Sequence, residues 1–84
     1  MTREEKLLKV ETEIQYYLGN FELGCEFHDY YLTRESEAAL SVIPQVLFLV
    51  GVISIGEKVE MNEKIMKKKM KIKENIKYGK EWSI

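Results

Sequence analysis

The feature that most limits the fold of this chain is an uncharged stretch of nineteen residues, AALSVIPQVLFLVGVISIG, at Ala38–Gly56. A helix needs about 20 apolar residues to cross a bilayer, so this stretch is long enough to span one. It is also long enough to supply the buried centre of a small domain. The chain has 84 residues, and we expect residues 1–84 to form a single small domain.

The N-terminal segment has the pattern of an amphipathic helix from about Thr2 to about Leu23. Thr2 and Glu5 have the spacing of a capping box, in which a hydroxyl and a carboxylate each accept a hydrogen bond from an early amide. The apolar residues that follow share one helical face: Leu7, Val10, Ile14, Tyr17, Leu18 and Phe21. Gly24 is expected to end this helix.

The central segment predicts a second helix that is followed by an ambiguous apolar run. Cys25–Leu32 is predicted to be a connector, and Thr33 the N-cap of the helix. Pro44 is expected to kink or break it. Residues 46–55 are rich in β-branched side chains without a helical stripe, so they suit a buried strand or a helix buried on all sides. We therefore predict a mainly α domain of about three helices around a central apolar segment, with an α+β fold that has a buried strand at 46–55 as the alternative.

The C-terminal segment is predicted to be a helix from about Asn62, as N-cap, to Gly79. Its apolar residues also alternate with lysines, which is a strand-like pattern, but methionine and lysine favour a helix. The residues that share a helical face are Met61, Ile65, Ile72 and Ile76. We expect Trp82 and Ile84 to fold back as an apolar anchor.

The flanks of the uncharged stretch favour a cytoplasmic domain over a membrane span. They are acidic or mixed, whereas basic and interfacial aromatic residues are expected close to a span. The charged N-terminus has no pattern of a secretory signal peptide, and the single cysteine, Cys25, fits a reducing compartment. The alternative is a single-pass membrane protein that spans residues 38–56 and has a basic cytoplasmic tail.

The sequence offers little chemistry for catalysis or for binding a metal. Cys25 and His28 have the spacing of half a zinc site, but the chain holds no other cysteine or histidine. Nothing in the sequence orients His28 as a base for the thiol, and no glycine-rich phosphate loop is present. We expect the protein not to be an enzyme, with no catalytic residue, no cofactor and no metal site.

The charges divide the chain into an acidic body and a basic tail. Residues 1–63 contain twelve acidic and five basic residues, whereas residues 64–80 contain eight lysines and one glutamate. A basic helix with an apolar face is suited to docking on another protein. Its lack of arginine disfavours specific recognition of nucleic acid, which leaves non-specific binding of phosphates as an alternative function.

These observations predict a small protein-binding module, an inhibitor or adaptor such as a phage encodes, that acts on another protein of unknown identity. The opposite charges of body and tail also make a homo-oligomer an expected state. Binding of nucleic acid by the basic tail and contact with a membrane are the alternative partners. The predicted partner-binding residues lie in the basic helix and in the aromatic connector: Lys64, Lys67, Lys68, Lys69, Lys71, Lys73, Lys77, Phe27, Tyr30 and Tyr31.

Overall fold

The first helix, α1, spans Arg3–Glu26 and begins as the sequence predicts. The structure is a computed structural model that describes residues 2–80, with the backbone alone for residues 77–80. Thr2 Oγ1 accepts from the amide of Glu5 at 3.1 Å, and Glu5 Oε1 accepts from the amide of Thr2 at 3.4 Å. These two hydrogen bonds satisfy two of the four amides that a helix start leaves unpaired, and they confirm the predicted capping box.

The end of α1 differs from the prediction, because the helix runs through Gly24 instead of stopping there. A Cβ atom at position 24 would lie 2.8 Å from the backbone nitrogen of Thr33, so this glycine allows a close approach to the next helix. The residue in the left-handed conformation is His28, with a φ of 57°. The amide of Asp29 then donates to the carbonyl of Gly24 at 2.8 Å, which closes the helix as a Schellman motif does.

The second helix, α2, spans Tyr30–Leu49, and it departs from the sequence prediction in where it begins and in continuing past Pro44. Its N-cap is Asp29, whose Oδ1 accepts from the amide of Leu32 at 3.0 Å, and not Thr33. Pro44 does not break the helix, since the helical backbone continues on both sides of it. The ring of Pro44 is fully buried, and this apolar burial offsets the hydrogen bond that proline cannot donate.

The third helix, α3, spans Ile55–Lys80 and starts earlier than the predicted cap at Asn62. Ser54 and Glu57 form a second capping box at its start. The amide of Ser54 donates to Glu57 Oε1 at 2.9 Å, and the amide of Glu57 donates to Ser54 Oγ at 3.2 Å. The strand considered at 46–55 is wrong, because residues 46–49 belong to α2, residue 55 begins α3, and 50–54 connect the two helices without a strand. Trp82 and Ile84 lie outside the described residues.

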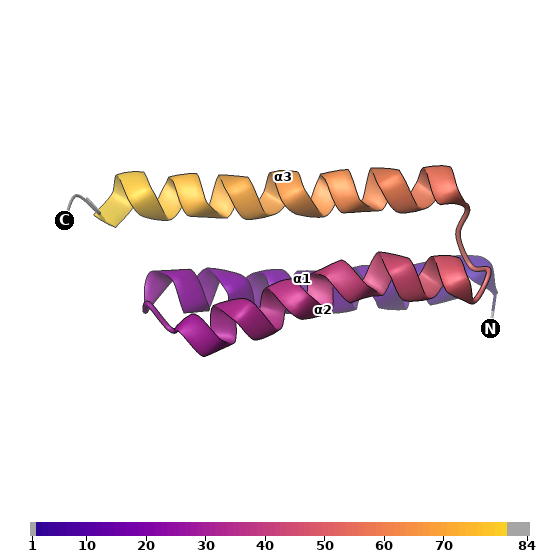
Figure 1. Cartoon of the computed structure of the whole chain (residues 1–84), viewed down its shortest axis with the longest axis horizontal. Helices are drawn as coiled ribbons and strands as arrows, with labels where there is room; N and C mark the ends of the chain where they lie inside the picture. The colour runs from indigo at the N-terminus through magenta and orange to yellow at the C-terminus, as the bar shows by residue number, and fades with distance from the viewer. Residues whose placement is uncertain (1, 81–84) are drawn as a thin grey trace.

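The three helices pack side by side in an elongated body of 47 × 20 × 17 Å (Figure 1). α1 and α2 form an antiparallel hairpin, and α3 runs along it. Near the connector between α2 and α3, the guanidinium of Arg3 donates from Nε to the carbonyl of Val52 at 3.1 Å and forms an ion pair with Glu57. This architecture confirms the mainly α prediction with about three helices, and residues 2–80 contain no strand.

The core lies between the three helices and uses only one face of the uncharged stretch. Ile14 and Leu18 of α1, Leu40 of α2 and Ile65 of α3 form its central cluster. Within the stretch, the buried residues are Leu40, Pro44, Leu47 and Ile53, whereas Val42, Val46, Leu49, Val50 and Ile55 are exposed. The predicted central segment is therefore half core and half surface, because α1 and α3 cover only part of α2.

The uncharged stretch is not one continuous helix, as the alternative of a span over residues 38–56 required. It is divided between the second half of α2, the connector and the first residues of α3. Within residues 2–80, we find no helix with both the length and the apolar character that crossing a membrane requires.

Candidate functional site

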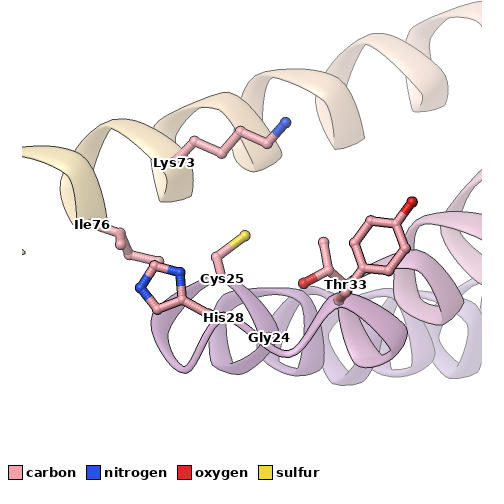
Figure 2. Close-up of a pocket in the computed structure, with 7 residues that line it drawn as sticks. Gly24, Cys25, His28, Thr33, Lys73 and Ile76 are labelled. Atoms are coloured by element: carbon pink, nitrogen blue, oxygen red, sulfur yellow. The ribbon is translucent and has the colours of Figure 1, made fainter. Parts of the chain in front are cut away.

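A pocket of about 520 Å³ lies where the connector between α1 and α2 faces the C-terminal part of α3. Figure 2 shows Cys25 and Thr33 on the hairpin side of this space, with Lys73 and Ile76 on α3 across from them. At this end of the molecule Gly24 lets Thr33 approach α1 closely, and α3 continues past the connector (Figure 1). The lining residues are Gly24, Cys25, His28, Tyr30, Thr33, Lys73 and Ile76.

The thiol of Cys25 is the most reactive group of the pocket in principle, but its surroundings keep it protonated. Burial raises the pKa of the Cys25 thiol above its usual range, against the smaller opposite effects of the Lys73 charge and the Thr33 hydroxyl. A thiolate is the nucleophile in cysteine chemistry, so a raised pKa makes Cys25 a poor one at neutral pH. Most of the surface that lines the pocket is apolar, so the pocket is suited to holding an apolar group by contact.

Cys25 and His28, which have the spacing of half a zinc site, both line the pocket. A zinc site needs three or four protein ligands. In the part of the chain that the structure describes, no group of three or more histidine, cysteine and acidic side chains gathers in a way that would hold a metal ion.

The aromatic residues predicted to bind a partner lie at the same end of the molecule as the pocket. Tyr30 and Tyr31 begin α2, and their side chains are 64% and 80% exposed. Their rings meet edge to face with 6.2 Å between centroids. Arg34 Nη1 donates to the hydroxyl of Tyr30 at 2.8 Å, which places a guanidinium beside the tyrosine pair. Phe27, the C-cap of α1, is also exposed.

The predicted basic helix is present, but its lysines do not form one surface. Lys69 points to the hairpin, where its Nζ lies 3.4 Å from Glu37 Oε2 and 6.0 Å from the ring centre of Phe21. The Nζ of Lys73 lies 5.8 Å from the same ring centre. These two lysines therefore help to attach α3 to the hairpin, and Lys73 also borders the pocket.

The other lysines lie on other sides of α3. Lys64 and Lys68 line a groove of about 260 Å³ against α1, and Lys68 and Lys71 line a second groove. Lys67 is exposed, and the side chain of Lys77 lies outside the described residues. Of the predicted lysines with described side chains, Lys73 is the one that lies with the aromatic connector.

Several residues of this site were not predicted from the sequence. Thr33 and Ile76 line the pocket, yet the sequence patterns assigned Thr33 to a helix cap and Ile76 to the core. Gly24 is the one sequence feature that could have indicated this site, since a glycine inside an otherwise helical segment often marks the close approach of another backbone.

Comparison with known proteins gives no further constraint. No protein-family model matches this chain, and neither a curated protein nor a solved structure is significantly similar to it.

Proposed function

We propose that this protein is a non-enzymatic binding module, an inhibitor or adaptor, that holds another protein at the end of the hairpin. The observation that carries the proposal is an exposed pair of tyrosines, in which Tyr30 lines an apolar pocket and the ring of Tyr31 meets Tyr30 edge to face. Residues that dominate binding energy at interfaces are enriched in tyrosine and cluster around well-packed pockets. Tyrosine also supplies a large contact area at a low cost in conformational entropy.

The charges around the pocket define the kind of partner segment that fits. Arg34 stands beside Tyr30, and Lys73 borders the pocket from α3. A segment with an apolar side chain to fill the pocket and a carboxylate to meet these cations matches both features. The sequence gives the partner no name, so the proposal defines it as a protein with an exposed acidic and apolar segment.

Site-specific photo-crosslinking tests this proposal. A photoreactive phenylalanine analogue replaces Tyr31 in one variant and Tyr16 in a control variant. Tyr16 is a suitable control because it is as exposed as Tyr30 but lies on α1, away from the pocket. In a lysate of the source cells, we expect the probe at position 31 to capture one protein and the probe at position 16 not to capture it.

Cys25 provides an independent reading of the same site, since it is the single cysteine of the chain and lines the pocket. Once the captured protein is purified, its addition should slow alkylation of Cys25 severalfold, and Tyr31→Ala should abolish this protection. Equal capture from positions 31 and 16, or alkylation that the captured protein leaves unchanged, would contradict the proposal.

A further inference from the structure

A second surface lies on the side of the hairpin that faces away from α3. Four apolar residues have the spacing of one helical face, and each is between 47% and 68% exposed. They are Val42, Val46 and Leu49 of α2 and its C-cap, Val50. They belong to the uncharged stretch, so the stripe itself carries no charge, and the nearest charge on the same face of α2 is Glu35, two turns before Val42. We call these four residues the α2 stripe.

The neighbouring edge of α1 carries three exposed charges beside the α2 stripe, Lys6, Lys9 and Glu13, and the last two lie closest to its centre. Glu13 shares a face of α1 with Gly24, which packs against Thr33 of α2, and Lys9 lies one turn before Glu13. Both side chains are exposed. Ile14 and Leu18 of α1 point into the core toward α3, so the edge with Lys9 and Glu13 lies on the opposite side.

The way α1 and α2 pair determines which residues of α2 lie next to Lys9 and Glu13. Gly24 lies against Thr33, and Arg3 reaches the carbonyl of Val52 at the other end. In an antiparallel pair with these two anchor points, Val46 lies level with the turn between Lys9 and Glu13. The α2 stripe and the two charges therefore form one continuous face of the hairpin.

We propose that this hairpin face pairs with the same face of a second copy of the chain, with the two α2 helices antiparallel. Val42 and Val50 stand at equal spacing on either side of Val46. A two-fold axis at Val46 therefore places Val42 of one copy against Val50 of the other and Val46 against its equivalent. This arrangement removes the apolar stripe of both copies from water.

The charges on α1 agree with the same axis. Because the axis passes midway between Lys9 and Glu13, Lys9 of each copy faces Glu13 of the other. A parallel pairing about a two-fold axis would instead put the two α1 helices on opposite sides of the α2 pair, so neither Lys9 nor Glu13 would find an opposite charge on the other α1. Under one two-fold axis the three valines of the stripe and the charges of Lys9 and Glu13 each find a partner, which favours a second copy over an unrelated protein.

Sedimentation equilibrium over a range of protein concentrations tests the proposal. We expect the wild-type chain to be a dimer, and Val46→Glu to weaken the dimer at least a hundredfold. Val59→Glu is the matched control, since Val59 is 51% exposed on α3 and lies outside the proposed interface. It should leave the dimer unchanged. Far-UV circular dichroism checks that both variants remain helical.

A charge exchange tests the orientation of the two copies. Lys9→Glu and Glu13→Lys alone should each weaken the dimer severalfold at low salt, and the double variant should restore it, because the reciprocal pairs form again. A wild-type chain that stays monomeric at millimolar concentration would overturn the proposal, as would a dimer that Val59→Glu breaks and Val46→Glu does not. If the single variants weaken the dimer and the double variant does not restore it, the antiparallel arrangement would be overturned.

The proposal is independent of the proposed function, since the pocket lies outside this face. Substitutions of pocket residues should therefore leave the dimer intact.

Discussion

The hairpin of α1 and α2 and the third helix are held in place by different kinds of contact. In the hairpin, the backbones approach closely at Gly24, and the side chains of Phe21 and Leu40 are fully buried. α3 instead contributes partly buried residues such as Met61 and Ile72 around the central Ile65. It is also attached by ion pairs, from Arg3 to Glu57 and from Glu37 to Lys69.

This difference indicates which part of the molecule sets its stability. Where two backbones pack closely, there is no space for a larger side chain. Side-chain contacts and exposed ion pairs can adjust to a substitution, so the loss in free energy of unfolding is small. We therefore expect the hairpin to be the more sensitive element and α3 the more tolerant one. Three substitution experiments test this comparison.

The largest expected effect is that of Leu40→Ala in the hairpin. Leu40 is fully buried in the central cluster, so removing its side chain leaves a cavity and should lower the free energy of unfolding by about 3 kcal/mol. Ile72→Ala in α3 should cost only about 1 kcal/mol, because Ile72 is partly exposed already. Urea unfolding followed by circular dichroism measures both. An equal loss in the two variants would break the comparison.

The same substitution at two glycines of α1 should have opposite effects. Gly24→Ala places a methyl group against the backbone of Thr33 and should destabilise the protein by about 2 kcal/mol. Gly19→Ala meets open space within the same helix, so it should stabilise by up to about 1 kcal/mol through its better helix propensity. Thermal unfolding of both variants reports the signs, and a Gly24→Ala variant as stable as the wild type would refute the close approach.

The smallest expected effect concerns the attachment of α3 and depends on pH. A hydrogen bond from the Ser54 amide, and next the Arg3 guanidinium, hold the pKa of the Glu57 carboxyl below its usual range. A carboxyl with a lowered pKa in the folded state stabilises the protein at neutral pH, and this contribution is lost as the pH falls below about 4. Glu57→Gln should therefore be less stable than the wild type at pH 7, with the difference shrinking at pH 3.

The exposed Glu60 of the same helix serves as the control for this experiment. Urea unfolding at both pH values compares Glu60→Gln with Glu57→Gln. A difference between Glu57→Gln and the wild type that grows on acidification would show that the carboxylate of Glu57 does not hold the start of α3.

Part of the candidate site could be predicted from the sequence, and part could not. The aromatic connector was found from composition, and the structure places Tyr30 and Tyr31 at the surface. The pocket beside them depends on residues far apart in the chain, such as Cys25 and Lys73. A periodic pattern reports which residues share a face of one helix, but not which residue of another helix lies across from it.

Helix ends show the same limit of sequence reasoning. The capping box at Thr2 was recognised because an amphipathic pattern follows it at once. The equivalent box at Ser54 lies inside the uncharged stretch, where the apolar run obscured the helix start. Gly24 was interpreted as a stop signal, whereas the structure uses it for packing and places the left-handed turn at His28.

The sequence by itself determined that this chain forms amphipathic helices, because the spacing of apolar residues and the local cap at Thr2 act within one segment. Only the tertiary structure decided which half of the uncharged stretch is core. Leu40 and Leu47 are buried, whereas Val46 and Leu49 remain on the surface. All four are equally apolar, so their burial depends on where α1 and α3 pack, and that arrangement comes from contacts between distant segments.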